Sequence, residues 1–322
     1  MTISSTTPRS GAGGTVAADP GPRAPQGRRK RRDGLPALAF LSPSIVTFLV
    51  FVAAPTAGVL YLSFYDWNLL SDGTFVGLDN FDRLVHDERL LGVYGSTTYM
   101  ALVILAVNVV LGLLLAVLLE ARMPRWLRAF FRLSFLFPFV VSASAVALIW
   151  RFLLNKDLGL VNYLLGLVGP EGADRIDWLG SSAWAPISVI VVNSWKTIGF
   201  SILVYIAGLQ SIPAQLKEAA VVDGANAWTR FWRITFPMLS PTIFFLVVIN
   251  TINSFQIFAE PRVLTQGGPG DASRTIVEYL YDRAFGDFEL GYASAIGITF
   301  TLVLIVLTAI QFRLSRRWTF YE

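Results

Sequence analysis

Six long apolar stretches, separated by polar segments, dominate the sequence. A helix needs about 20 predominantly apolar residues to cross the hydrocarbon core of a bilayer, and each stretch approaches or exceeds that length. A single charged residue, Lys196, interrupts one of them. The sequence therefore predicts an all-α membrane bundle of six transmembrane helices, over residues 35–64, 93–119, 133–150, 182–206, 242–259 and 290–312.

The charges between these stretches predict the orientation, because Lys and Arg are retained on the cytoplasmic side of membrane proteins. With the N-terminus inside, the cytoplasmic segments hold 17 basic and 6 acidic residues. The external segments then hold 8 basic and 16 acidic residues. Both termini are therefore expected in the cytoplasm.

Residues 1–34 differ in composition from the rest. They are rich in Gly, Pro, Ser and Thr up to residue 27, and five basic residues follow at 28–32. This composition predicts a disordered cytoplasmic tail, whose basic run anchors the topology on anionic lipid and does not bind nucleic acid. We expect the transmembrane domain to occupy residues 35–322, with one long cytoplasmic loop at 207–241.

Composition narrows the function further. Hydrophobic residues make up 54% of the chain and charged residues 15%, with a mean hydropathy of +0.57. There is no Cys, and the one His is His86, which argues against thiolate metal sites, disulfides and a Ser-His-Asp triad. None of the four lysines follows a glycine, so a Walker A phosphate loop is absent. We expect neither an enzyme nor a chain with its own metal or cofactor.

The cytoplasmic loop 207–241 is too long and too apolar for a simple connector. Pro213 suits the first turn of a helix, the residues up to Val222 are good helix formers, and Gly224 can adopt the left-handed conformation that ends a helix. Asn226 can cap a second, short helix. The apolar residues of that helix, at nearly helical spacing, are Trp228, Phe231, Trp232 and Ile234.

These features predict a helix–turn–helix beneath the membrane. It either packs on the floor of the bundle as an interfacial element or is exposed as a docking site for a cytosolic partner. Pro237 and Pro241, with Ser240 as a cap, are expected to break the chain before the fifth span.

The same loop resembles the EAA loop of ABC-importer permeases, whose pattern is Glu-Ala-Ala-x3-Gly-x9-Ile-x-Leu-Pro. Phe236 stands where the pattern has Leu, and the matching residues are Glu218, Ala219, Ala220, Gly224, Ile234 and Pro237. Two further elements, Gly77-Leu78-Asp79-Asn80-Phe81 and Leu264-Thr265-Gln266-Gly267-Gly268-Pro269, resemble the carbohydrate branch of this family. The second is typical of the first of the two permeases, the MalF type, here in a six-span form.

The resemblance implies the type I ABC importer permease fold and a subunit that forms half of a translocation pathway for a sugar or oligosaccharide. The implied partners are a second permease, a cytosolic ATPase dimer that binds the ATP, and an extracytoplasmic solute-binding protein, in a bacterial inner membrane. In this family the loop is the coupling helix. Glu218 would then contact the ATPase, Ala219 and Ala220 would pack closely, and Gly224 would form the turn beside Asp223.

Polar residues inside the apolar stretches are candidates for lining the pathway, because a bilayer otherwise penalises them. Their amides and ammonium group can hydrogen-bond sugar hydroxyls. The alternative is that they only join helices across the bundle, which we expect of Asn108. The candidates are Asn193 and Lys196 in the fourth stretch, with Asn250, Asn253, Ser254 and the less well aligned Gln256 in the fifth.

The external segment 260–289 is acidic and contains Gly267, Gly268 and Pro269. It is either a flexible connector or, as the resemblance implies, part of the surface that faces the solute-binding protein.

A secondary transporter driven by an ion gradient is the alternative from another class. It would need acidic residues inside the spans, and no Asp or Glu falls within the six stretches. The solute stays open among disaccharides, oligosaccharides, amino sugars and glycerol-3-phosphate. Lys196 is the one cation inside the stretches, which is little support for a dianionic phosphate, so we expect a neutral saccharide.

Overall fold

The computed structural model describes residues 34–68, 72–120, 123–169 and 176–316. These residues are predominantly helical, and a short antiparallel hairpin pairs β1 (Tyr65–Asp66) with β2 (Thr74–Phe75). The predicted all-α class is therefore confirmed for the described residues. The predicted disordered tail lies outside them, apart from Gly34.

The chain divides into two units after Ala54. The described part of the first unit consists of α1 (Gly34–Phe48) and a π-helical turn (Leu49–Ala53). The helix continues into α2 (Ala54–Leu62). Its part from Ala39 to Leu62 has 24 residues and is long and apolar enough to cross a membrane. This segment matches the first predicted span.

The second unit contains three more segments that match predictions. The second, fourth and sixth predicted spans correspond to helical segments of 33, 28 and 26 residues, each long and apolar enough to cross a membrane. Each is longer than the apolar stretch that predicted it: the first extends beyond its stretch at both ends, and the other two extend only at their C-terminal ends. The elements are α4 (Glu88–Ala106), a π-helical turn (Val107–Leu111), α5 (Gly112–Glu120), α9 (Trp184–Ser211) and α15 (Leu290–Ser315).

The third predicted span is wrong as a single helix. The structure has α6 (Arg125–Val140) and α7 (Ala143–Leu153), which meet at an angle of 101°. Pro138 lies in the last turn of α6, which its missing N–H deprives of one backbone hydrogen bond. Val141 and Ser142 are then extended. In the described part of the chain, five segments can each cross a membrane, and six if this bent pair counts as one span.

The predicted break before the fifth span is also wrong. Helix α11 (Ala227–Arg230) continues through a π-helical turn (Phe231–Thr235) into α12 (Phe236–Phe255). Pro237 is tolerated because it lies just after the π-helical turn, a local adjustment that accommodates a missing backbone donor in membrane helices. Pro241 is accommodated inside α12, as proline often is in membrane helices, and Ser240 is buried there and does not act as a cap. The predicted second helix of the loop is thus the beginning of the span.

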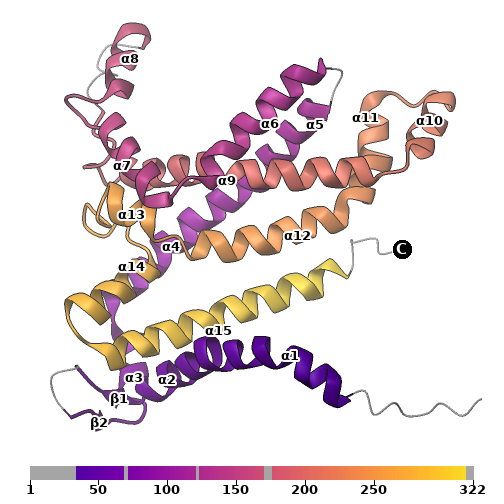
Figure 1. Cartoon of the computed structure of the whole chain (residues 1–322). Helices are drawn as coiled ribbons and strands as arrows, with labels where there is room; N and C mark the ends of the chain where they lie inside the picture. The colour runs from indigo at the N-terminus through magenta and orange to yellow at the C-terminus, as the bar shows by residue number, and fades with distance from the viewer. Residues whose placement is uncertain (1–33, 69–71, 121–122, 170–175, 317–322) are drawn as a thin grey trace, which may run out of the picture. The chain divides into compact units, whose positions relative to one another are not determined.

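Short helices gather at the two ends of the second unit. Helices α13 and α14 lie at one end, and α10 and α11 lie at the opposite end (Figure 1). This separation agrees with the predicted alternation of external and cytoplasmic segments. The remaining helices are α3 (Asp79–His86), α8 (Leu160–Val168), α10 (Ala214–Val222), α13 (Ala259–Leu264) and α14 (Ile276–Tyr281).

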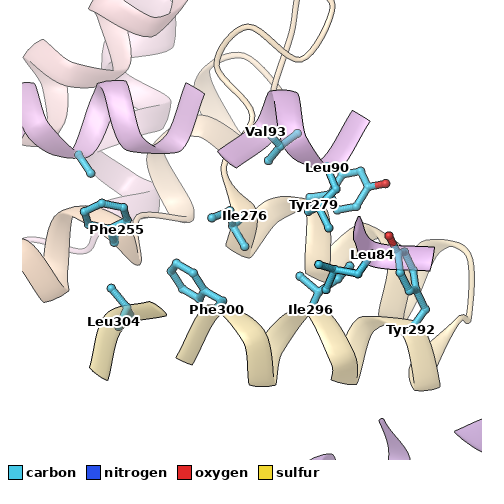
Figure 2. Close-up of a cluster of buried hydrophobic side chains, with 11 residues drawn as sticks. Leu84, Leu90, Val93, Phe255, Ile276, Tyr279, Tyr292, Ile296, Phe300 and Leu304 are labelled. Atoms are coloured by element: carbon cyan, nitrogen blue, oxygen red, sulfur yellow. The ribbon is translucent and has the colours of Figure 1, made fainter. Parts of the chain in front are cut away.

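An apolar stripe on α15 organises the end of the unit that carries α13 and α14. Tyr292, Ile296, Phe300 and Leu304 follow each other at intervals of four, so they share one face of the helix. They point toward Leu84, Leu90, Val93, Ile276, Tyr279 and Phe255 of the neighbouring helices (Figure 2). A second buried cluster joins α5, α6, α9 and α12 near residues 207–241, which we call the coupling loop after its predicted role.

Candidate coupling loop and solute pathway

Local sequence signals shape the coupling loop as predicted. Gly224 has φ of +75°, a conformation that costs a residue with a side chain about 1–2 kcal/mol. The turn is closed by Ala225 N–H, which donates to the Ala220 carbonyl at 2.9 Å. The Asn226 side chain then accepts from Thr229 N–H at 2.8 Å and caps α11. Pro213 stands directly before α10, one residue outside its predicted place in the first turn.

The predicted contact residues of α10 do not all face outward. Glu218, Ala219 and Asp223 are exposed, so they are accessible to a partner. Ala220 is buried, with 8% of its surface exposed. The expectation that Ala220 packs against a partner is therefore wrong, because its methyl group packs against its own chain.

The loop that carries Glu218 also has exposed apolar side chains. Val222 is 88% exposed and Trp228 is 71% exposed. The rings of Trp228 and Trp232 pack edge to face with centroids 5.6 Å apart. Exposed apolar surface of this kind, next to polar residues, is typical of protein–protein contacts. Ile234 and Pro237, the other matches to the family pattern, are half-buried at the start of the long helix.

Four of the six predicted pathway residues lie together. Asn193, Asn250, Asn253 and Ser254 line a small cavity of about 50 Å³. Asn108, Thr197, Ile104, Phe139 and Phe200 complete its wall. The rings of Phe139 and Phe200 are stacked, with centroids 5.4 Å apart. Amides, hydroxyls and aromatic rings therefore form the surface of this cavity.

Asn108 connects the helices around the cavity. Its Nδ2 donates to Thr197 Oγ1 at 2.9 Å and to Asn250 Oδ1 at 3.2 Å. Asn250 Nδ2 donates in turn to Ser201 Oγ at 3.2 Å. The predicted role of Asn108 as a contact between helices is confirmed. Its Oδ1 is buried and accepts no hydrogen bond from the described residues, so it is also available to a ligand.

Lys196 and Gln256 lie apart from this cavity. Lys196 is half-buried on α9 and is not among the lining residues. Gln256 is exposed and lines an open groove between α12 and α15. Which neighbours a polar residue meets depends on helix rotation and packing, which residue spacing along one helix does not specify.

Hydrogen bonds hold the external loop that contains Gly267, Gly268 and Pro269. Ser273 Oγ donates to the Gly268 carbonyl at 2.7 Å. Gly267 has φ of +77°, and a Cβ there would lie 2.9 Å from Arg274 Nε. Asp271 pairs with Arg274 at 2.5 Å and with Arg89 at the start of α4 at 2.6 Å. The pair between Asp271 and Arg89 thereby fixes the loop to the start of α4.

Two carboxyl groups near this loop have opposite surroundings. Burial alone would raise the pKa of Asp87, but hydrogen bonds from the Tyr292 and Tyr279 hydroxyls, both at 2.7 Å, hold that pKa below its usual value. Glu278 is fully buried, and burial raises its pKa to about 7. The Arg262 guanidinium is close to this carboxyl group, with Nη1 3.6 Å from Glu278 Oε1.

Comparison with known proteins agrees with this geometry. Residues 108–320 match the family described as binding-protein-dependent transport system inner membrane component. The probable ABC transporter permease YurN of Bacillus subtilis (strain 168) is 37% identical over 275 residues, covering 85% of this chain and 94% of that protein. The sn-glycerol-3-phosphate transport system permease UgpA of Agrobacterium fabrum is 34% identical over 283 residues, covering 87% and 94%.

A solved structure is similar over nearly the whole chain. It is the bacterial alginate ABC transporter in complex with an alginate pentasaccharide-bound periplasmic protein, with a TM-score of 0.78 and 28% identity, covering 89% of this chain and 95% of that chain. The fold is thus the type I importer permease fold, and the protein spans the membrane several times. This chain belongs to the family of binding-protein-dependent transport system inner membrane components, the permeases of ABC importers.

Proposed function

We propose that this chain is one of two permease subunits of an ATP-driven importer for a neutral carbohydrate, located in a bacterial inner membrane. It pairs with a second permease, docks a cytosolic ATPase dimer and receives the solute from an extracytoplasmic binding protein. The observation that carries the proposal is the coupling loop, where Glu218 is exposed on a short helix held by the turn at Gly224.

The coupling loop suits a cleft in another protein. Its exposed carboxylates, Glu218 and Asp223, stand among exposed Leu216, Val222 and Trp228. Apolar groups supply the buried area of such an interface, and the carboxylates fix its register. Since this chain has no Walker A sequence, the energy comes from the docked ATPase. An ion-gradient mechanism would need acidic residues inside the spans, and the six apolar stretches contain no Asp or Glu.

The cavity favours an uncharged polyhydroxyl solute. Its lining residues carry amides and hydroxyls, which both donate and accept hydrogen bonds, and none of them is charged. Aromatic walls with a few placed polar groups are typical of small-molecule sites. With about 50 Å³, the cavity has room for only a few waters in this conformation, so the bundle must open to admit a sugar.

Glycerol-3-phosphate is the other candidate, since the relative UgpA is named for it. A phosphate would need a cation or several N–H donors in the site. Lys196 is the cation of the fourth span, and it does not line the cavity. The neutral saccharide is therefore the better fit.

The docking role is tested by co-purification. The tagged chain is expressed with the permease, ATPase and binding protein expected beside its gene, and the ATPase retained per permease is measured. Glu218→Ala should lose most of the ATPase and of solute uptake into proteoliposomes. Glu88→Ala, an exposed glutamate at the start of α4, is the matched control and should lose neither. Full ATPase retention and normal uptake by Glu218→Ala would contradict the docking role.

The solute class is tested separately on the binding protein. Its thermal unfolding is followed with a panel of neutral disaccharides and oligosaccharides and with sn-glycerol-3-phosphate. A rise of the midpoint with a neutral saccharide is expected, whereas a rise with sn-glycerol-3-phosphate alone would refute the neutral solute and leave the docking role intact.

A further inference from the structure

One carboxylate joins three helices next to the coupling loop. Glu120, at the end of α5, accepts a hydrogen bond on Oε1 from Arg132 Nη2 of α6 at 2.5 Å. The same oxygen accepts from Gln210 Nε2, near the end of α9, at 3.3 Å. We call Glu120, Arg132 and Gln210 the clasp. The two charged side chains are 24% and 33% exposed, so water screens the pair only in part.

The clasp lies directly beside the coupling loop. Glu120 lines a hollow of about 620 Å³ whose wall also includes Lys217, Glu218, Val221 and Arg230. Lys217 Nζ donates to the Leu209 carbonyl at 3.2 Å, one residue before Gln210. Helix α10 is thus bonded to the same turn of α9 that the clasp holds.

Apolar packing continues the connection into the bundle. Each clasp residue has a sequence neighbour in one hydrophobic cluster: Leu119 beside Glu120, Phe131 beside Arg132, and Leu209 beside Gln210. Apolar contacts hold helices together but have little directional preference. A charged hydrogen bond has a defined geometry, so the clasp fixes how the three helix ends are placed relative to one another.

From this arrangement we propose that Glu120 and Arg132 are positioning residues that make the ends of α5 and α6 move together with the coupling loop. The proposal rests on the docking role given above. A sideways displacement of α10 reaches α9 through its chain connection and Lys217. The clasp passes the displacement on to α5 and α6, so that the two helices follow as one body with α9. Without the clasp, ATP hydrolysis would proceed with less of this movement.

The movement is measured with two spin labels. The chain has no native cysteine, so Ala129→Cys in α6 and Gln215→Cys in α10, both exposed, can be labelled without other changes. Distances are recorded in the assembled importer, before and after trapping with ATP and vanadate. The distance should stay constant on trapping when the clasp is intact and change when Glu120→Gln is introduced.

Coupling is measured as ATP hydrolysis with and without the binding protein, in the same assembly. Glu120→Gln and Arg132→Gln should each raise hydrolysis without binding protein by about two- to fivefold, the shift that a pair of this exposure can produce in an equilibrium. The double variant Glu120→Arg with Arg132→Glu exchanges the two charges, and it should bring hydrolysis without binding protein most of the way back to the parent rate. Arg125→Gln removes an exposed charge of α6 that is not part of the clasp and should change neither measurement.

The outcomes separate this proposal from the docking role. Glu120→Gln should retain the ATPase on purification, whereas Glu218→Ala should not. Retention of the ATPase by Glu120→Gln, together with hydrolysis and label distances equal to those of Arg125→Gln, would overturn the clasp. A label distance that changes on trapping in the parent protein as much as in Glu120→Gln would overturn it too.

Discussion

Gly199 lies where α9 crosses α6, and the backbone of α6 occupies the space that a side chain would need. A Cβ on Gly199 would lie 1.9 Å from the Phe135 carbonyl oxygen and 2.7 Å from its carbon. Phe200 follows Gly199, and Phe139 is one turn after Phe135. The same crossing therefore holds the two stacked rings of the cavity wall.

We predict that Gly199→Ala destabilises the protein by about 1–3 kcal/mol, as adding a methyl group to a packed interior does. Real Cβ atoms do not approach other heavy atoms closer than 3.0 Å. The two helices would have to separate by about 1 Å, and backbone atoms cannot turn aside as a flexible side chain can. The unfolding midpoint should fall by roughly 2–10 °C.

The assay is thermal unfolding in lipid nanodiscs, followed by the fluorescence of the nine tryptophans. Gly95→Ala in α4 is the matched control, because no atom lies within 4 Å of the Cβ it would add. Alanine favours a helix over glycine by roughly 0.5–1 kcal/mol, so the control should unfold at the parent temperature or above it. Equal midpoints for the two variants would refute the close crossing of α6 and α9.

Three further predictions concern the pH response, the cavity and the turn. Because burial raises the pKa of Glu278 to about 7 from 4.5, the stability of the protein should be greatest below pH 4.5 and fall as the pH rises to about 7. The unfolding midpoint of Glu278→Gln should therefore exceed that of the parent most at pH 8 and least at pH 5. A difference in midpoint that does not depend on pH would contradict this. Asn108→Ala should lower the unfolding free energy by about 0.6–1.7 kcal/mol, the range for hydrogen bonds between membrane helices, in the same thermal assay, and an unchanged midpoint would argue against its bonds to Thr197 and Asn250. Gly224→Val should retain less ATPase on purification than Gly224→Asn, because Asn tolerates a positive φ better than a β-branched residue; equal retention would show that the turn is not needed for docking.

The coupling turn was predictable because its signals are local. A glycine that needs a positive φ and an asparagine that caps the next helix act within four residues of chain. The charge balance of the loops likewise agrees with the separation of α10 and α11 from α13 and α14 (Figure 1). Features of this kind do not depend on how distant helices pack.

The bend between α6 and α7 and the continuity of α11 with α12 were not predictable in the same way. The length of an apolar stretch shows that the segment prefers lipid or a core, but it does not show whether the helix bends or continues straight. Proline has opposite outcomes at the two places: α6 ends soon after Pro138, whereas the helix continues through Pro237, which lies just after a π-helical turn. Apolar length does not show where such a turn forms.

The pathway residues were predictable on one helix and not between helices. Asn250, Asn253 and Ser254 share a face through their spacing alone. That Asn108 and the rings of Phe139 and Phe200 would meet them is a consequence of tertiary packing. Asn108 was visible as an amide inside an apolar stretch, and the two rings had no distinguishing signal.

The helix that leaves the coupling loop is the same rod that carries the asparagines of the cavity. From Arg230 to Asn250 it rises about 30 Å, at 1.5 Å per residue. A rod of that length, tilted by about 5° at its cytosolic end, carries its far end through about 2–3 Å. Work done on one face of the membrane can therefore reach the cavity as leverage along a single piece of backbone, with no relay of side chains in between.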